Sequence, residues 1–256
     1  MSYNYEISAT IVLYENDIKV LKKTIESFLQ IPLKKRLFLI DNSKRNILEN
    51  EVNNPEISYQ FIGRNIGFGA ANNLVIQRIK NNSKYHLILN PDVTFSSDVI
   101  PSLIKAFQNE DNIAMIAPEV LFPDGRRQYS CRRYPTFRDL FIRRSGFLKR
   151  IFSSVIHKGE YKDKDLTKSF YPDFVHGCFM LFKTQDFIKI EGFDEHYFLY
   201  MEDVDICKKI DVIGKKKMYY PNKQITHILK KDSSKNVRFF LIHFISSIKY
   251  FKKWGF

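Results

Sequence analysis

Asp92 stands where a carboxylate could hold a divalent cation. It follows a short apolar run and comes directly after Pro91, which restricts the local backbone, so the carboxylate should project from the end of a strand. Mg²⁺ and Mn²⁺ bind through one or two carboxylates together with phosphate oxygens of a substrate. Taken alone, Asn90-Pro91-Asp92 could equally be a turn or the start of a helix.

A second set of acidic residues, between Asp194 and Asp205, is interspersed with aromatic residues. Asp203 is the candidate general base of this segment, because aromatic neighbours desolvate a carboxylate and raise its pKa towards the range useful for taking a proton from an alcohol. Asp194 and Glu202 are candidates for contacts to an acceptor or a phosphate group. The alternative interpretation is a solvated helix start at which carboxylates offset the helix dipole. For Glu202 and Asp205 taken on their own, this alternative is preferred.

A third group of residues could bind a nucleotide. Asp41 also follows an apolar run, where its carboxylate could accept a hydrogen bond from the imide N–H of uracil or thymine, or could cap a helix. The small residues after Asn65 would let backbone N–H groups approach a diphosphate closely, although glycines needed only for a turn look the same. The spacing fits neither the Walker loop nor the Rossmann dinucleotide motif. The candidate donor-binding residues are Asp41, Asn42, Arg64, Asn65, Gly67, Asn72, Asn90 and Asp92.

Three further positions could contact a metal or a phosphate. His227 follows a short strand pattern and could be a metal ligand or a phosphate contact, although a single histidine is more often structural. Arg132 and Arg133 could bind a phosphate through bidentate contacts, although exposed arginine pairs are common. The three cysteines lack metal-ligand spacing and predict neither a disulfide framework nor a zinc site, which fits a reducing cytoplasm.

Alternating strands and helices are expected to position these residues. Apolar runs predict strands over 7–13, 37–40, 57–62 and 85–89, separated by an apolar helical stripe from Leu21 to Leu29 and a helix over 70–80. This alternation predicts an α/β fold with a mostly parallel central sheet flanked by helices. In such sheets, ligands bind beyond the carboxyl ends of strands where the strand order reverses, which is where Asp41 and Asp92 would lie.

The second half of the chain is less regular. We expect strands over 113–121, 174–182, 216–220 and 224–229, and a helix over 203–213 that ends at Gly214. Residues 137–156 and the chain from Val237 onward have the pattern of basic, aromatic-rich amphipathic helices. The sequence therefore predicts one domain over 1–235 and a helical tail over 236–256 that contacts a membrane surface or a partner. Packing of these aromatic residues against the core or in a dimer is the alternative.

The basic composition limits the partners. With a net charge of +13 and a pI near 9.5, the surface should attract nucleic acid, an anionic membrane leaflet or phosphorylated substrates. A nucleic-acid-binding module would present a continuous basic stripe, and the acids at 92 and 194–205 argue against it, so we expect no nucleic-acid partner. No run of eighteen apolar residues occurs and the first residues lack a signal-peptide pattern, so we expect a cytoplasmic protein with peripheral membrane association.

Together these motifs resemble the inverting family 2 glycosyltransferases with the GT-A fold, whose central sheet is Rossmann-like and mostly parallel. The resemblance extends over roughly residues 5–230 and rests on the order and spacing of the motifs. The segments that carry it are Leu39-Ile40-Asp41-Asn42-Ser43, Asn65-Ile66-Gly67-Phe68-Gly69 with Asn72-Asn73, Leu89-Asn90-Pro91-Asp92-Val93, and the acidic segment 192–205.

Within that family, the chain is most similar to bacterial rhamnosyltransferases of O-antigen and cell-wall assembly. The residues that carry this likeness are Arg132-Arg133-Tyr134-Pro135, followed by a basic helix, and Phe174-Val175-His176-Gly177-Cys178-Phe179-Met180-Leu181. It implies transfer of L-rhamnose from dTDP-L-rhamnose onto a saccharide linked to undecaprenyl diphosphate, at the inner face of the cytoplasmic membrane. Related members use galactose, glucose or galactofuranose, and a nucleotidyltransferase with a similar sheet is a further alternative.

The resemblance also implies a role for each main site residue. Asp41 would contact the nucleobase, and Asp203 would deprotonate the acceptor hydroxyl. Asp92 would hold Mg²⁺ or Mn²⁺ against the donor diphosphate, and His227 would close this metal site. The usual metal motif of these enzymes is Asp-X-Asp, whereas this chain has Asn90 at the first position, which leaves Asp92 as the one side-chain carboxylate expected on the metal.

Overall fold

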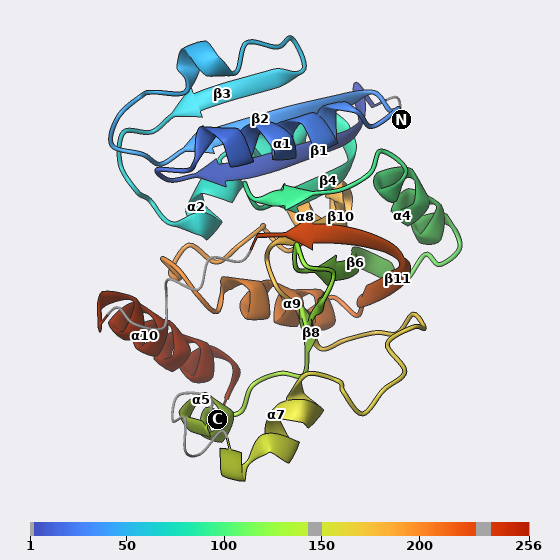
Figure 1. Cartoon of the computed structure of the whole chain (residues 1–256), viewed down its shortest axis with the longest axis vertical. Helices are drawn as coiled ribbons and strands as arrows, with labels where there is room; N and C mark the ends of the chain where they lie inside the picture. Colours follow the sequence, from blue (N-terminus) through green and yellow to red (C-terminus); the bar gives the residue numbers. More distant parts are fainter. Residues whose placement is uncertain (1–2, 143–149, 229–236, 256) are drawn as a thin grey trace.

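A mixed β-sheet forms the centre of the computed structural model, which describes residues 3–142, 150–228 and 237–255 (Figure 1). Within these ranges the sheet has nine strands, in the order β3-β2-β1-β4-β10-β6-β11-β5 with β7 paired to β6. The strands are β1 (Tyr5–Leu13), β2 (Lys35–Asp41), β3 (Ile57–Phe61), β4 (Ser83–Leu89), β5 (Val93–Thr94), β6 (Ile113–Leu121), β7 (Arg127–Gln128), β10 (Phe179–Lys183) and β11 (Lys216–His227).

The first four long strands are parallel, and their order reverses beside β1. Strand β1 pairs with β2 on one side and with β4 on the other, and β2 pairs with β3. The chain therefore runs outward from β1 to β3 and then returns across β1 to form β4. Such a reversal leaves a crevice beyond the carboxyl ends of β1 and β4, at Leu13 and Leu89, where α/β sheets bind ligands.

Strand β10 connects this parallel half to the rest of the sheet. It pairs antiparallel with both β4 and β6, and β11 continues the sheet parallel to β6. At the end of β11, His227 lies opposite Val93 of the short strand β5, which immediately follows Asp92. The sheet therefore brings two residues of the predicted metal site to the same edge.

Side chains of the strands alternate between two apolar layers, as a period of two residues requires. Helices α1 and α4 cover the face that contains Leu37 and Leu87. The other face, which contains Ile40 and Ile88, packs against the remaining core helices and against the C-terminal half of α10. The helices are α1 (Ile18–Leu29), α2 (Phe68–Asn73), α3 (Ile76–Ile79), α4 (Val99–Gln108), α8 (Thr184–Lys189), α9 (Glu202–Val212) and α10 (Val237–Trp254).

Helices α5 (Phe137–Ile142), α7 (Ser153–Gly159) and α10 lie together at the end of the molecule opposite β3 (Figure 1). A two-stranded sheet of β8 (Cys131–Arg132) and β9 (Phe174–Val175) joins this end to α9. A single 3₁₀ turn, η1 (Glu49–Glu51), follows β2. No helix among the described residues is both long and apolar enough to cross a membrane.

The α/β architecture with a mostly parallel sheet is confirmed, and two local predictions need correction. The expected strand over 174–182 is two strands, because the chain leaves β9 to pass through 176–178 before β10 begins. The two strands expected over 216–229 are one strand, β11, with irregular register between Tyr220 and Gln224. Helix α4 was not predicted, and of the helix expected over 137–156 the part at 143–149 lies outside the described residues.

Candidate active site

The strand-order reversal between β1 and β4 borders a cavity of about 260 Å³. The ends of both strands, the start of α1 and the ring of Phe68 line it, and Asn90 and Asp92 lie on its wall. Two of the predicted donor-binding residues therefore face the crevice in which α/β sheets bind their ligands.

Asp92 is paired with His227 at this crevice. Nε2 of His227 lies 3.3 Å from Oδ1 of Asp92, and the two side chains are 7% and 21% exposed, respectively. On the other side of the ring, Nδ1 lies 3.0 Å from Oε1 of Gln128. The Gln128 amide is oriented by its Nε2, which donates to the carbonyl groups of Leu121 at 3.2 Å and His227 at 2.7 Å. Nδ1 of His227 therefore carries the proton donated to Gln128, and Nε2 faces Asp92.

The Asp92–His227 pair fits a divalent cation that is shared with a phosphorylated substrate. One carboxylate and one imidazole leave most of the coordination sphere to phosphate oxygens and water, as Mg²⁺ and Mn²⁺ require. Across the described ranges, no group of three or more His, Cys, Asp or Glu side chains is arranged to hold a metal, so an all-protein zinc site is not formed there. Burial alone would lower the pKa of His227, but its hydrogen bonds, the one to Asp92 foremost, raise the pKa to about 10, so a cation bound there would displace the proton on Nε2.

Asp203 lies in a second and larger cleft of about 570 Å³, bounded by β8, α5, α7, β9, the start of α9 and His243 of α10. The neighbouring Glu202 is buried, and its Oε2 has no hydrogen-bond partner within the described part of the chain. Burial raises the pKa of both carboxyl groups, and at Asp203 the N–H groups of Val204 and Gly177 partly oppose this effect. A carboxylate whose pKa is raised in a cleft is suited to accept a proton from a bound alcohol.

The turn before α9 has a strained backbone. Tyr200 and Met201 have φ values of 68° and 69°, in the left-handed region that few residues other than glycine adopt. Helix α10 supports this turn, because Ser246 Oγ donates to the carbonyl of Leu199 at 2.9 Å and the rings of His243 and Tyr200 are 5.2 Å apart. Strain that surrounding contacts maintain is typical of functional sites, and here it directs the first residues of α9 into the cleft.

A three-residue segment, 176–178, connects the two cavities. The N–H of Gly177 donates to the carboxylate of Asp203, and the carbonyl of Cys178 accepts from the N–H of Asn90 at 2.9 Å. A Cβ atom on Gly177 would lie 3.7 Å from Cβ of Asp203. Neighbouring residues of this short segment therefore contact Asp203 and Asn90, which brings the two candidate centres, far apart in the sequence, close to one another.

A family comparison agrees with this geometry. The sequence profile described as "Glycosyl transferase family 2" matches residues 8–190, more than half of the 256-residue chain. The chain belongs to glycosyl transferase family 2. A second profile, described as "N-terminal domain of galactosyltransferase", matches residues 163–231, which include Asp203 and His227.

Two curated relatives of this family 2 glycosyltransferase are rhamnosyltransferases by name. "Rhamnosyltransferase WbbL" of Escherichia coli strain K12 is 25% identical over 204 residues, which cover 76% of this chain and 74% of that protein. "N-acetylglucosaminyl-diphospho-decaprenol L-rhamnosyltransferase" of Mycobacterium tuberculosis is 26% identical over 187 residues, which cover 68% of this chain. The match spans 59% of the mycobacterial protein, so that relative is considerably longer than the matched region.

Solved structures confirm the GT-A fold. GalNAc-T7, determined with UDP, GalNAc and Mn²⁺, aligns with a TM-score of 0.67 at 15% identity, over 89% of this chain and 44% of that one. The mannosyltransferase PcManGT from Pyrobaculum calidifontis, in complex with GDP-Man and Mn²⁺, aligns with a TM-score of 0.62 at 14% identity, over 97% of this chain and 65% of that one. At these identities the likeness concerns the fold.

Asp41 of this glycosyltransferase is held by neighbouring protein groups. It is fully buried, and its two oxygens accept hydrogen bonds from the hydroxyl of Tyr59 at 2.7 Å and from the N–H of Ser43 at 2.9 Å. Each carboxylate oxygen can accept a second hydrogen bond, so the nucleobase contact expected for Asp41 stays a prediction. Asp41 also fixes the loop that begins with Asn42, whose buried Oδ1 has no partner within the described residues.

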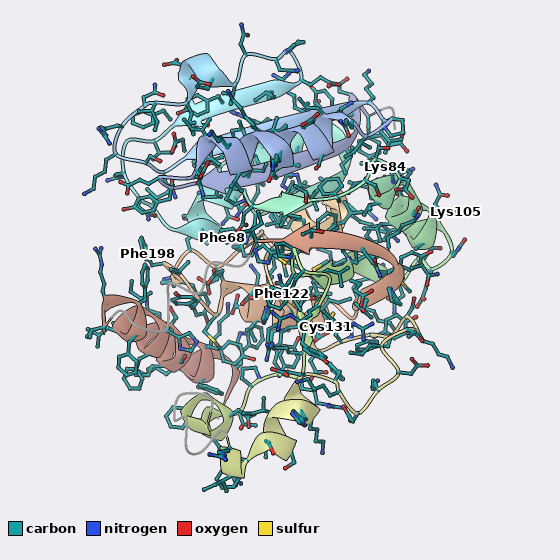
Figure 2. All side chains as sticks on the ribbon, viewed as in Figure 1. Phe68, Lys84, Lys105, Phe122, Cys131 and Phe198 are labelled. Carbon is teal, nitrogen blue, oxygen red and sulfur yellow. The ribbon has the colours of Figure 1, made fainter. Side chains whose placement is uncertain are left out.

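The glycines of segment 67–69 serve the packing of the acidic segment, and their approach to a diphosphate stays a prediction. A Cβ atom on Gly67, which has φ +93°, would lie 2.6 Å from the carbonyl oxygen of Phe198. The N–H of Phe68 donates to that same carbonyl at 3.3 Å, and Figure 2 shows Phe68 and Phe198 side by side. Across from them, the side chain of Asn73 bonds to both the N–H and the carbonyl of Phe193.

The other predicted donor-binding residues surround this junction. Asn65 Oδ1 accepts from the N–H of Gly67 at 2.9 Å, and the Nδ2 group of Asn42 donates to the carbonyl of Gly67 at 3.2 Å. Asn72 is buried and donates to the carbonyl of Phe68, whereas Arg64 is exposed. Asn42 and Asn65 thus lie together, while Asn72 has a local helical role.

The two arginines predicted to bind phosphate have acidic partners. Arg133 forms a bidentate pair with Asp163, at 2.9 and 2.8 Å, so its fork is already occupied. Arg132 pairs with Glu160 at 3.0 Å, and both arginines line the Asp203 cleft. Asp163 and Glu160 lie in the irregular segment after α7, which gave no signal in the sequence.

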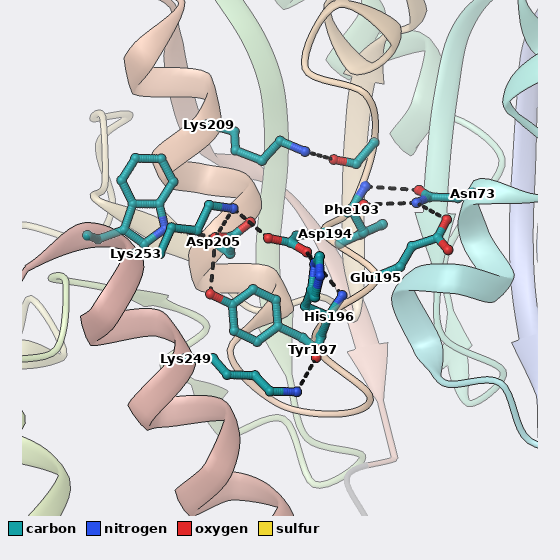
Figure 3. A network of polar contacts seen from close by, with 12 residues as sticks. Asn73, Phe193, Asp194, Glu195, His196, Tyr197, Asp205, Lys209, Lys249 and Lys253 are labelled. Carbon is teal, nitrogen blue, oxygen red and sulfur yellow. Dashed lines mark hydrogen bonds and ion pairs between the residues drawn. The ribbon is translucent and has the colours of Figure 1, made fainter.

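Asp194 lies outside the residues that line the Asp203 cleft, contrary to the prediction. Its carboxylate pairs with Lys253 of α10 at 2.7 Å and with His196 at 2.8 Å (Figure 3). Lys253 also lies 2.8 Å from Asp205, which accepts from Trp254 Nε1 at 2.7 Å. Although burial alone would raise the pKa of Asp194, these contacts lower it below the ordinary range. The C-terminal helix is therefore attached to the acidic segment.

Two residues of the site, Gln128 and His243, were not predicted. Gln128 lies in a two-residue strand after a turn, a context without a recognisable signal. His243 shares a helical stripe with Ser247 and Tyr250, which are buried, so its spacing could have indicated that it faces the domain.

Proposed function

We propose that this family 2 glycosyltransferase is an inverting L-rhamnosyltransferase. It moves L-rhamnose from dTDP-L-rhamnose onto a hydroxyl group of a saccharide linked to undecaprenyl diphosphate, at the inner, cytoplasmic face of the membrane. The observation that carries the proposal is the contact of segment 176–178 with both Asp203 and Asn90, which lines the crevice of the Asp92–His227 pair. The names of the E. coli and mycobacterial relatives support rhamnose as the sugar, and the mycobacterial name supports a lipid-diphosphate acceptor.

Asp203 acts as the general base of this reaction. The acceptor hydroxyl loses its proton to Asp203 as its oxygen attacks the anomeric carbon, and the bond to the donor diphosphate breaks on the opposite face, so the configuration inverts. A base in this position typically contributes about 10²–10⁴-fold to the rate. The strained turn at Tyr200 and Met201 keeps the carboxylate in the cleft, and the buried Glu202 beside it contacts the acceptor sugar.

Asp92 and His227 hold Mg²⁺ or Mn²⁺ on the donor side. Bound there, the cation supplies neutralisation of the charge that develops on the leaving diphosphate. Gln128 keeps Nε2 of His227 directed towards Asp92, and Asn90 lies beside them on the wall of the same crevice. Asn42, whose buried Oδ1 has no partner within the described residues, is the donor-side residue that we assign to the nucleotide beside Asp41.

A panel of nucleotide sugars tests the donor. With undecaprenyl-diphosphate-linked N-acetylglucosamine as acceptor, dTDP-L-rhamnose should give product in the presence of Mg²⁺ or Mn²⁺, and galactose, glucose and galactofuranose donors should give much less. Preference for one of those donors would keep the glycosyltransferase activity and overturn the rhamnose assignment.

A substitution tests the base. Asp203→Asn should lower the transfer rate by about 10²-fold or more while the affinity for the nucleotide sugar stays the same. Asp165→Asn is the matched control, because Asp165 is exposed and bonds only to neighbouring residues of its own loop. Near-normal turnover of Asp203→Asn with intact donor binding would show that another group takes the proton.

A further inference from the structure

Helix α10 presents an exposed apolar face in its first half. The side chains of this face are 40–73% exposed and recur at spacings of three, four, seven and eight residues, as one side of a helix requires. The apolar face consists of Val237, Phe240, Leu241, Phe244 and Ile245. A contiguous apolar patch of this kind marks a surface that other molecules contact.

The orientation of α10 is fixed, so this face cannot turn towards the core. Ser246 and Tyr250, on the side opposite the apolar face, are buried against the domain, as are Ser247 and Phe251 further along the helix. The ion pairs of Lys253 with Asp194 and Asp205 prevent rotation at the C-terminal end of the helix (Figure 3). The apolar face therefore points away from the domain.

The charges of α10 are all positive. The helix contains Arg238, Lys249, Lys252 and Lys253 and no aspartate or glutamate. Lys252 is exposed on the same side as the apolar face, about two turns further along, and Lys249, also exposed, donates to the carbonyl of His196 at 2.6 Å. An apolar patch on a helix whose charges are all positive matches a leaflet in which anionic headgroups surround an apolar interior.

The position of the face links it to the Asp203 cleft. His243 lines that cleft, and in the sequence it comes three residues after Phe240 and directly before Phe244, whose rings stack 6.3 Å apart. Helices α5 and α7, which also border the cleft, lie at the same end of the molecule (Figure 1). A surface that contacts the face would therefore also be close to the cleft.

We propose that the apolar face of α10 inserts into the headgroup region of an anionic lipid leaflet and holds the Asp203 cleft at the membrane surface. The reason for such docking depends on the proposed function, since a lipid-linked acceptor would reach the cleft only at the leaflet. A second copy of the chain is the less suitable occupant, because a two-fold contact through α10 would bring like charges of both copies together without any acid on either helix.

Flotation of the full chain with vesicles tests the docking without any substrate. Vesicles of phosphatidylglycerol and phosphatidylethanolamine should bind the chain, and vesicles of phosphatidylcholine should bind it less. Leu241→Glu with Ile245→Glu should weaken binding by about tenfold or more, because both side chains are half exposed and the new charges oppose insertion. Lys252→Gln should weaken binding to the anionic vesicles by about fivefold.

The control variant also replaces two exposed apolar side chains by glutamate, but outside α10. It is Ile47→Glu with Val212→Glu, at side chains that are 52% and 71% exposed. This variant should bind vesicles as well as the unmodified chain. Equal vesicle binding by the two double variants, or loss of vesicle binding in both, would overturn the proposal. Sedimentation showing that the apolar face forms a dimer that does not bind vesicles would overturn it as well. Vesicle binding that depends on Leu241 and Ile245, in a chain that transfers no sugar from dTDP-L-rhamnose, would support the docking while the proposed function fails.

Discussion

Replacing Lys253 by methionine should loosen α10 from the domain. Lys253 Nζ lies 2.8 Å from Asp205 and 2.7 Å from Asp194, and it neutralises a carboxylate that is fully buried. Methionine keeps the length and the apolar stem of the lysine side chain but removes its charge. Asp205 would then keep only the hydrogen bonds from Trp254 at 2.7 Å and Tyr197 at 3.3 Å.

The expected loss of stability is about 2–3 kcal/mol. Removing one partner of a buried ion pair costs about 3–5 kcal/mol, because the remaining charge is left in a poorly solvated position. Lys253 is 34% exposed, so water can replace part of its interaction, and the two remaining hydrogen bonds reduce the cost further. Asp205→Asn added to Lys253→Met should recover about 1–2 kcal/mol, since the amide carries no charge that needs the lysine.

Urea unfolding measures this loss, and Trp254 reports its location. It is the single tryptophan of the chain and lies beside the ion pair, so its fluorescence follows the docking of α10, whereas circular dichroism follows the whole fold. The two transitions should coincide in the unmodified chain. Lys252→Met is the matched control, because Lys252 is exposed and carries the same charge. A Lys253→Met variant as stable as this control, or a double variant no better than the single one, would refute the reasoning.

Three further outcomes follow from the site. Because burial raises the pKa of Asp203, its carboxyl group holds a proton to higher pH in the folded chain than in the unfolded chain. The transfer rate should therefore rise as the pH passes through the pKa of Asp203, which lies above the ordinary aspartate range. The stability that protonated Asp203 contributes should be complete in acid and should be lost as the pH rises through the same pKa. Gln128→Leu should weaken Mn²⁺ binding by about 10- to 100-fold in calorimetric titration without unfolding the chain, and an unchanged isotherm would contradict its orienting role. Gly192→Ala should cost at least about 2 kcal/mol in urea unfolding, since its Cβ would lie 2.3 Å from Asn73 Oδ1. Gly214→Ala is the control with a similar φ and open space around it, and equal costs would remove the packing argument.

The elements that obey local rules could be predicted from the sequence. Strands β1, β2 and β4 are short apolar runs separated by amphipathic helices, and the polar residues that follow them lie at the carboxyl ends where a parallel sheet places them. Helix α9 begins at the predicted acidic segment and ends before Gly214. The Asp92–His227 contact was expected from the family resemblance, since the two residues meet only through the pairing of β5 with β11.

The roles of single side chains depended on partners that no local pattern identifies. Asp41 has the sequence context of a ligand-binding carboxylate, yet the hydroxyl of Tyr59 on the next strand donates a hydrogen bond to it. Arg133 is matched by Asp163, and Asp194 by Lys253, across long stretches of intervening chain. A charge motif therefore indicates that a residue needs a partner, and only the fold decides whether that partner is a substrate or another side chain.

The acidic segment illustrates how one stretch of sequence can serve two purposes. Asp194 and Asp205 attach α10, whereas Glu202 and Asp203, only a few residues away, face the cleft. The left-handed turn at Tyr200 and Met201 precedes both groups: Glu202 and Asp203, directly after it, line the cleft, and Asp205 lies on the side of α9 that contacts α10. Because α10 itself supports that turn, a change that releases the helix should also disturb the geometry of Asp203. Helix α10 thus sets the positions of both the base and the proposed membrane-docking face. Detaching α10 should therefore reduce sugar transfer and vesicle binding together, whereas altering only its outer face should reduce vesicle binding alone.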